Sequence, residues 1–292
     1  MTTRRSFFKT AGLGATAVAG LAAGGCSTLP EVPGKKETDT FRLGIAGYTF
    51  VKFNIDETLE MMKKVDAHYL CIKNFHLPET CTAGEAAAFH KKCAEYGVTG
   101  YGCGPLYMDS HEAAEKAFEY VKRVGVKTLV GVPYKKVGKK RVEDQELLEY
   151  INTLVQKYDI KYAIHNHGPD MPELFPNAES AIKRIAHMDK RMGLCLDIGH
   201  QFRDGRCPVQ AIMDYSERIH DMHIKNVSAD TKKGRTIEMP RGKIDITAVV
   251  KALRKVKYSG VCSLEYEKDM SDPITGIAES IGYFKGIMDA TR

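Results

Sequence analysis

The chain has 292 residues, 43% of them hydrophobic and 27% charged, a balance typical of a globular protein with one large α/β domain or two small ones. Its formal net charge is +6, to which the leader residues Arg4, Arg5 and Lys9 contribute three charges, leaving about +3. A charge this small argues against a protein that binds nucleic acid or an anionic membrane surface.

The first residues predict an export signal that is removed from the mature protein. Residues 4–8 (RRSFF) resemble a twin-arginine motif, and an apolar run rich in Ala and Gly follows over residues 11–25. That run is too short and too rich in glycine for a good membrane span. The alternative, a buried helix of the fold, would leave the paired arginines unexplained.

Cys26 follows Ala23, Gly24 and Gly25, and this arrangement is similar to a lipoprotein cleavage site. The resemblance implies that Cys26 becomes a lipidated amino terminus. Residues 27–40 are polar and contain two prolines, which predicts a linker. We therefore expect a signal peptide over residues 1–26, a linker over residues 27–40, and a location in the periplasm or, through the lipid, at the membrane.

From residue 41 onward, predicted strands and helices alternate. Strands are expected over residues 41–50, 68–73, 98–106, 126–132, 160–165, 192–196, 219–227 and 261–266. Helices are expected over residues 54–67, 83–96, 109–123, 143–157, 178–187, 208–218, 246–256 and 273–288. A basic loop is expected over residues 135–141, and Gly97 and Gly125 are expected to end the helices before them.

This alternation predicts a single-domain (β/α)₈ TIM barrel over residues 41–292. The alternative is a doubly wound open sheet, but no glycine-rich dinucleotide fingerprint follows the first predicted strand. The eight cysteines show no CxxC pair and no metal-finger spacing. Four of them lie in or at the end of apolar strand-like runs and are expected to be small buried side chains, namely Cys71, Cys103, Cys195 and Cys262.

Polar side chains stand at the ends of four consecutive predicted strands. They are His165 and His167, then Asp197 and His200, then His223 and Lys225, and finally Glu265 and Glu267. Any one of these residues alone would be interpreted as a hydrogen-bonded histidine or a charged surface side chain. In a barrel, however, these ends meet on one face, and imidazole and carboxylate ligands suit one divalent metal such as Mn²⁺, Zn²⁺, Co²⁺, Fe²⁺ or Mg²⁺. The sequence therefore predicts a metal site.

The chain resembles the xylose isomerase-like TIM barrels, a superfamily that includes sugar isomerases, sugar 3-epimerases, inosose dehydratases and keto-glycoside lyases. The matching motifs are HNH at 165–167, LDIGH at 196–200, HIKN at 223–226, PRGKID at 240–245 and LEY at 264–266. By position, the resemblance implies that Asp197, His223 and Glu265 are metal ligands. His165, the expected fourth ligand, stands where the epimerases have a glutamate.

The resemblance also assigns roles outside the metal ligands. Glu265 is the expected base, Lys225 is expected to neutralise an enolate oxygen, and His200 is expected to contact a substrate hydroxyl. The expected substrate-binding residues are His167, His200, Arg241, Tyr48 and Tyr101. The alternative for Lys225 is a surface lysine, and for Arg241 it is a solvated charge in a loop. For Tyr48 and Tyr101 the alternative is a tyrosine without a role in binding, because tyrosines are common at strand ends.

The chemistry implied by the family is removal of a proton beside a carbonyl of a sugar or keto-sugar. Because His165 replaces one of the two epimerase glutamates, β-elimination of the 3-keto-glycoside lyase type is favoured over isomerisation or epimerisation. Two other classes stay open: a non-catalytic sugar-binding lipoprotein, and a metal-dependent abasic-site endonuclease, against which export and low charge argue. The expected partner is a small carbohydrate, without nucleic acid, and the chain could form homo-oligomers.

Overall fold

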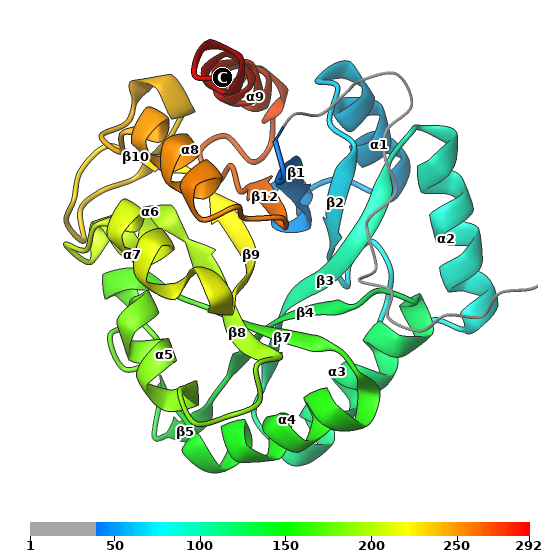
Figure 1. The fold of residues 1–292 in the computed structure, drawn as a ribbon. Coiled ribbons are helices and arrows are strands. Elements are labelled where there is room, and N and C mark those ends of the chain that lie inside the picture. The colour runs from blue at the N-terminus through cyan, green and yellow to red at the C-terminus, as the bar shows by residue number, and fades with distance from the viewer. Residues whose placement is uncertain (1–38) are drawn as a thin grey trace, which may run out of the picture. The chain divides into compact units, whose positions relative to one another are not determined.

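The computed structural model describes residues 39–292, and these form a closed parallel barrel in the strand order β1-β12-β9-β8-β7-β4-β3-β2. Helices surround the strands, as Figure 1 shows. The barrel strands are β1 (Arg42–Ala46), β2 (Tyr69–Ile72), β3 (Thr99–Met108), β4 (Thr128–Pro133), β7 (Lys161–His165), β8 (Met192–Asp197), β9 (Ile219–Ile224) and β12 (Val261–Leu264). The predicted (β/α)₈ fold is confirmed.

The helices of the outer layer begin and end close to the predicted positions, except for α6, which was not predicted. They are α1 (Ile55–Lys64), α2 (Ala83–Glu95), α3 (His111–Val124), α4 (Gln145–Tyr158), α5 (Ala178–Ile185), α6 (Ile198–Arg203), α7 (Pro208–Tyr215), α8 (Ile246–Lys255) and α9 (Ile274–Ala290). Short 3-10 helices are η1 (Gly47–Phe50), η2 (Gly168–Asp170), η3 (Ser216–Arg218) and η4 (Met239–Arg241).

Local sequence signals explain several helix boundaries. Asn54 and Glu57 form a capping box at the start of α1, and Ser110 accepts a hydrogen bond from the Ala113 amide at the start of α3. Gly125 ends α3 with a φ of 83°, a left-handed conformation that glycine adopts without a steric cost. These caps fix where each helix returns the chain to the barrel.

The barrel closes because β1 pairs with β12 in parallel, with Arg42 opposite Val261 and Ile45 opposite Leu264. Most of the buried strands read as apolar runs because side chains on both of their faces are covered, by the barrel interior or by the helices, whereas β9 (IHDMHI) also carries polar residues. The carboxyl ends of the strands consequently lie on one face, where the polar residues of β7, β8, β9 and β12 are gathered.

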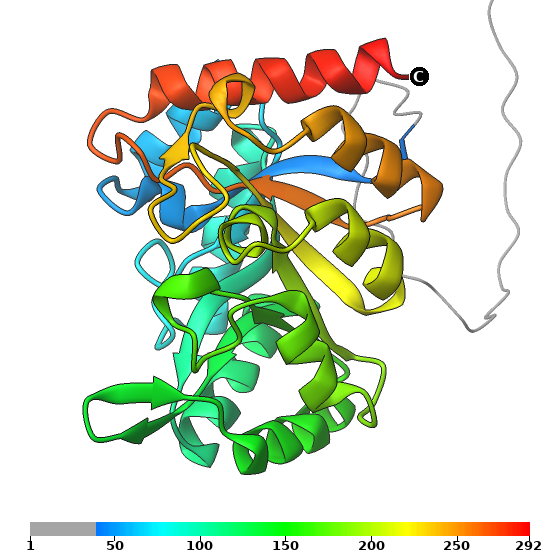
Figure 2. The same cartoon turned by 90° about the vertical axis from the view of Figure 1, so that its left-hand side faces the viewer.

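The structure corrects several details of the predicted elements. Residues 47–50 form η1 instead of extending β1, and β9 ends at Ile224. The next residues form β10 (Asn226–Val227), which pairs with β11 (Thr236–Ile237), so the long loop contains a small hairpin. The basic loop is a second hairpin of β5 (Lys135–Val137) and β6 (Lys140–Val142), which projects at the left of Figure 2. Finally, α6 follows β8 directly.

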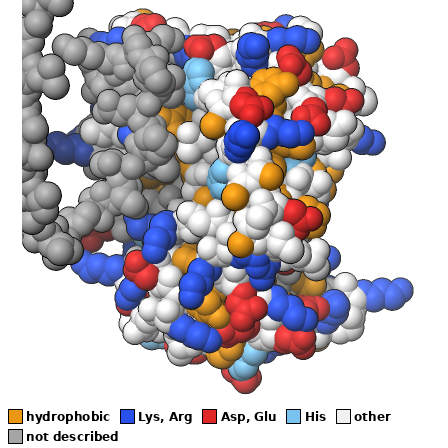
Figure 3. Space-filling model, turned by 90° about the vertical axis from the view of Figure 1, so that its right-hand side faces the viewer, with side chains coloured by type: hydrophobic (Ala, Val, Ile, Leu, Met, Phe, Trp, Pro, Cys, Tyr) orange, Lys and Arg blue, Asp and Glu red, His pale blue; other side chains and the backbone are white. Residues whose placement is uncertain are grey.

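The expected signal peptide and Cys26 lie outside the described residues. At the start of the described residues, Asp39 pairs with Arg254 at 2.6 Å, and the Thr40 hydroxyl donates to the Tyr258 carbonyl at 2.5 Å. Within residues 39–292, no helix is long and apolar enough to cross a membrane. Basic and acidic side chains are interspersed on the face drawn in Figure 3.

Candidate metal centre

Four neighbouring strands carry the predicted ligands to one place. His165 and Asp197 are the last residues of β7 and β8, His223 lies in β9, and Glu265 directly follows β12. The parallel register places Asp197 opposite His223, and His223 opposite Ser263, two residues before Glu265. His165 lies opposite Cys195, two residues before Asp197. Residues two apart on a strand point to the same side, so the four side chains converge.

The ligand atoms of these four residues all lie within 4.8 Å of one another. His165 Nε2 is 3.1 Å from His223 Nδ1 and 3.5 Å from Asp197 Oδ2. Glu265 Oε2 lies 3.2 Å from His223 Nδ1 and 4.0 Å from His165 Nε2. Four donors held at about 2.1 Å in a tetrahedron would lie about 3.4 Å apart, which matches this spacing.

The chemistry of the donor set also fits a metal ion. All four side chains are buried, and Asp197 and Glu265 share the Lys225 ammonium, which lies 3.0 Å from Asp197 Oδ2 and 2.6 Å from Glu265 Oε2. Two buried carboxylates beside a single ammonium leave negative charge that a bound metal cation would neutralise. Two imidazoles and two carboxylates are ligands that Zn²⁺, Mn²⁺, Co²⁺ and Fe²⁺ accept. The cluster can therefore hold a divalent metal.

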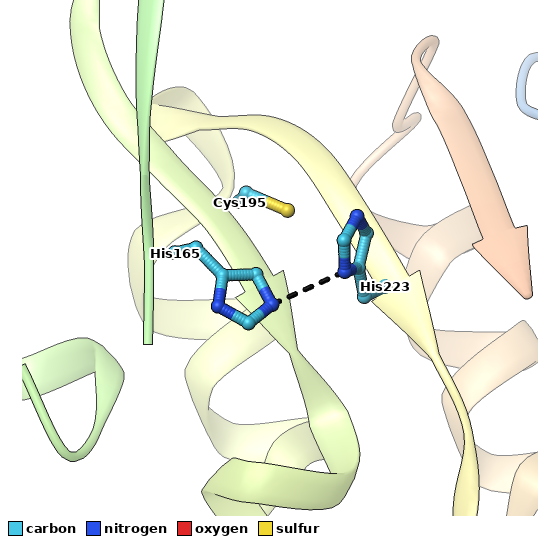
Figure 4. A group of neighbouring side chains, drawn as sticks. All are labelled: His165, Cys195 and His223. Atoms are coloured by element: carbon cyan, nitrogen blue, oxygen red, sulfur yellow. Dashed lines mark hydrogen bonds between the residues drawn. The ribbon is translucent and has the colours of Figure 1, made fainter. Parts of the chain in front are cut away.

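Cys195 offers a sulfur to the same two histidines, as Figure 4 shows. Its thiol lies 3.8 Å from Asp221 Oδ2, and burial together with the charge of Asp221 raises the pKa of Cys195 well above its ordinary value. Because only the thiolate is a strong ligand, Cys195 is a poor donor here. The set with Asp197 and Glu265 is the better site.

Burial and neighbouring charges keep His165, Asp197 and Glu265 in forms that bind metal. Burial lowers the pKa of His165, so its imidazole is neutral. Burial would raise the pKa values of Asp197 and Glu265, but Lys225 and adjacent histidines outweigh it and hold both below their ordinary values. For His223 burial opposes the charge of Glu265, which prevails and raises the pKa of the imidazole. Metal binding would displace that proton.

Lys225 is enclosed by three carboxylates. Its Nζ lies 2.6 Å from Glu265 Oε2, 2.6 Å from Glu267 Oε2 and 3.0 Å from Asp197 Oδ2, and its side chain is 1% exposed. Three acceptors match the three N–H donors of an ammonium group. The structure therefore shows Lys225 holding the carboxylates, and contact with a substrate oxygen would require one of these pairs to open.

Asp197 is held in place by one residue of its own LDIGH motif, His200, and by one residue of the HNH motif, Asn166. Its Oδ1 accepts from the His200 amide at 2.7 Å and so caps α6, which leaves Oδ2 directed at the cluster. The Asn166 side chain accepts from the Asp197 amide at 2.8 Å and donates to its carbonyl at 3.1 Å. The sequence analysis gave Asn166 no role, although its place between two histidines of the HNH motif was a signal.

His167 and His200 lie at the mouth of the site. Their rings stack with centroids 6.2 Å apart, and His167 Nε2 is 2.8 Å from the Tyr107 hydroxyl. Burial lowers the pKa of His200 to about 3 and that of His167 well below its ordinary value, so both rings are neutral. Arg141 on the β5–β6 hairpin covers the Tyr107 ring at 4.8 Å. Tyr107 was missed because β3 is longer than predicted.

The other predicted substrate-binding residues lie elsewhere. Tyr101 is the third residue of β3, not its end, and its buried hydroxyl contacts Asp221 at 2.9 Å and Ser263 at 2.6 Å inside the barrel, where no sugar ring can stack on it. Arg241 is exposed and pairs with Glu279 of α9 at 2.6 Å. Tyr48 lies in η1 after β1 and is 37% exposed, so its ring is accessible.

The chain is similar to one known family and to several solved structures. The family model described as xylose isomerase-like TIM barrel matches residues 45–287. No curated protein sequence matches the chain. An uncharacterised protein from Parabacteroides distasonis is 23% identical, with a TM-score of 0.64, over 85% of this chain and 99% of that one.

Two further structures are similar in fold. The IOLI protein, solved with a bound zinc atom, is 18% identical with a TM-score of 0.65, over 86% of this chain and 99% of that one. A probable 3-DHS dehydratase from Bacillus anthracis is 11% identical with a TM-score of 0.67, over 84% and 99% of the two chains. Because the family model spans most of the described barrel, the chain belongs to the xylose isomerase-like TIM barrel family.

Proposed function

We propose that this chain is a divalent-metal-dependent carbohydrate enzyme that removes a proton next to a carbonyl of a sugar or keto-sugar, with β-elimination as the outcome. The observation that carries the proposal is the buried cluster of His165, Asp197, His223 and Glu265 at the face where barrel enzymes place their chemistry. A bound divalent cation would supply Lewis-acid stabilisation of the negative charge that develops on the carbonyl oxygen.

Glu265 is the residue best placed to take the proton. Its Oε2 faces the cluster, and the ammonium of Lys225 keeps it ionised despite burial. Neutral His167 and His200 at the mouth can exchange hydrogen bonds with substrate hydroxyls without adding charge. The site thus combines one buried carboxylate base with uncharged polar contacts.

The arrangement of the carboxylates supports elimination over epimerisation. Asp197, Glu265 and Glu267 each place an oxygen within 3.0 Å of Lys225 Nζ, so they gather on one side of the pocket. Epimerisation by two bases needs a proton-transfer group on each face of the sugar, and His165 stands where the second carboxylate would be. Elimination needs one base and a leaving group. The similar fold of a probable 3-DHS dehydratase is an analogy in the same direction.

We also propose that the protein is exported through its twin-arginine motif and acts on free sugars or glycosides, because sugar phosphates are scarce outside the cytoplasm. A 3-keto-glycoside fits this setting, since its proton at C2 is acidic and its C1 substituent can leave. Lipid attachment at Cys26 would keep the enzyme at the membrane.

The test is incubation of the metal-loaded protein with a 3-keto-glucoside in D₂O. Release of the aglycone with loss of the C2 proton is expected, and Glu265→Gln should slow it by about 10² to 10⁴, as loss of a general base typically does. Accumulation of ketoses or epimers from a free sugar, with the aglycone still attached, would favour the isomerase or epimerase alternative. Binding of both compounds without proton exchange would indicate a sugar-binding module.

A further inference from the structure

The barrel interior contains two levels of side chains related by the two-residue period of the strands. The lower level contains Cys71, Cys195, Asp221 and Ser263, and the Tyr101 hydroxyl bonds to Asp221 and Ser263 and lies beside the Cys71 thiol. Two residues further along each strand stand Lys73, Asp197, His223 and Glu265. Because such pairs share a face, the four form the upper level. Asp197, His223 and Glu265 belong to the metal centre, whereas Lys73, the fourth residue of this level, is not one of its ligands.

Lys73 is held at the mouth of the barrel by its backbone surroundings. Its Nζ donates a hydrogen bond to the Pro105 carbonyl, and its side chain is only partly exposed. Gly47, just after β1, packs so closely that an added Cβ would lie 3.0 Å from Lys73 Cβ. The start of the side chain therefore packs against the residue after β1, and its amine is bound to β3.

Lys73 and Lys225 differ in the groups that surround their amines. Lys225 is surrounded by three carboxylates, whereas among residues 39–292 no carboxylate forms an ion pair with Lys73, which has one carbonyl acceptor. An ammonium has three N–H donors, so Lys73 retains donors for a ligand. Burial lowers the pKa of Lys73, with the charge of Glu265 opposing, so its proton is released more readily than from a free lysine.

We propose that Lys73 is the general acid that protonates the leaving oxygen in the elimination, and this inference rests on the proposed function. In that step, Glu265 takes the proton from the carbon beside the carbonyl. The electron pair of the broken C–H bond forms a C=C bond, the C–O bond to the leaving group breaks, and the leaving oxygen takes a proton from the Lys73 ammonium. Solvent then takes the proton from Glu265 and gives a proton back to the neutral Lys73 amine.

The position of β2 makes this division of roles geometrically reasonable. In the barrel order, β2 is separated from β12 by β1 alone, on the side of Glu265 opposite β9. Lys73 and Lys225 therefore follow strands on opposite sides of β12, and the charge of Glu265 influences both amines. Lys225 is bound to three carboxylates, so its three N–H donors are already used, whereas Lys73 has one carbonyl acceptor.

The test compares two leaving groups in the metal-loaded full chain. Lys73→Met should slow release of methanol from a methyl 3-keto-glucoside by about 10² to 10⁴, the usual loss for a general acid. Release of 4-nitrophenol from the matching aryl substrate should fall by less than about tenfold, because that anion leaves without protonation. The variant should keep its metal content by elemental analysis and still exchange the C2 proton in D₂O.

Lys251→Met on the exposed surface of α8 is the matched control and should leave both rates unchanged. Circular dichroism checks the fold, and Lys73→Gln replaces the methionine variant if that one does not fold. Equal losses with both leaving groups, no loss with either, or loss of metal or proton exchange would overturn the role of Lys73 while the parent still eliminates. A parent protein that neither exchanges nor eliminates would overturn the proposed function itself.

Discussion

Replacement of Lys225 by methionine should expose how strongly the site depends on positive charge. The side chains of Lys225, Asp197 and Glu265 are 1%, 0% and 4% exposed, so removal of the ammonium leaves two carboxylates buried without it. Breaking a buried ion pair from one side costs about 3 to 5 kcal/mol. Glu267 is 28% exposed and should add less than about 1 kcal/mol. We expect the metal-free variant to lose about 3 to 5 kcal/mol in its free energy of unfolding.

A metal ion bound by the same carboxylates should recover much of this loss. Any protein gains about 2.7 kcal/mol from a ligand at 100 times its Kd, and the variant should gain more than the parent at equal metal concentration because the competing ammonium is gone. Urea titrations with a chelator and with Zn²⁺ or Mn²⁺ measure both differences, with Lys251→Met as the surface control. A loss below about 1 kcal/mol without metal, or equal gains from metal in both proteins, would refute the reasoning.

Three further predictions concern the interior, pH and export. Tyr101→Phe should destabilise the protein by about 1 to 3 kcal/mol, measured by urea unfolding, because the buried Asp221 loses a hydrogen-bond donor; an unchanged midpoint would contradict this. His76 is buried, and burial lowers its pKa from 6.5 to about 4. Neutral His76 therefore contributes fully to the free energy of unfolding above pH 6.5. This contribution decreases by about 3 kcal/mol as the pH falls to 4, because the imidazole is protonated at a higher pH in the unfolded chain than in the folded one. His76→Gln should flatten this part of a thermal-stability profile, and an identical slope would show that other groups are responsible. Substitution of both Arg4 and Arg5 by lysine should retain the folded precursor in the cytoplasm, whereas normal recovery in the envelope fraction would exclude twin-arginine transport.

The sequence was sufficient for the barrel and its four candidate ligands because both depend on short-range patterns. Alternation of apolar runs and helical segments predicts the (β/α)₈ fold, and polar residues at strand ends must meet once the strands are parallel and closed. The HNH and LDIGH motifs located His165 and Asp197 without knowledge of any contact. Element boundaries were less certain, as the length of β3 shows, because hydrogen bonding beyond the apolar run decides where a strand ends.

Other features of the site depend on contacts between distant residues. Tyr101 was expected at the mouth, but the chain places it early in β3, so its hydroxyl lies one level deeper. Arg241 sits in a matching motif, yet its guanidinium is directed to Glu279 of α9, 38 positions along the chain. The surroundings of Lys225 and Lys73 could not be predicted either, because both lysines follow apolar strands and differ only in what other strands present to them.

The central claim is that His165, Asp197, His223 and Glu265 bind one divalent metal ion. Equilibrium dialysis of purified protein against Zn²⁺ or Mn²⁺, followed by elemental analysis, tests it most directly. We predict one ion per parent chain and a near-complete loss of bound metal in Asp197→Ala and in His223→Ala, with circular dichroism unchanged. Unaltered metal content in both folded variants, or a parent chain that binds no metal, would contradict the account.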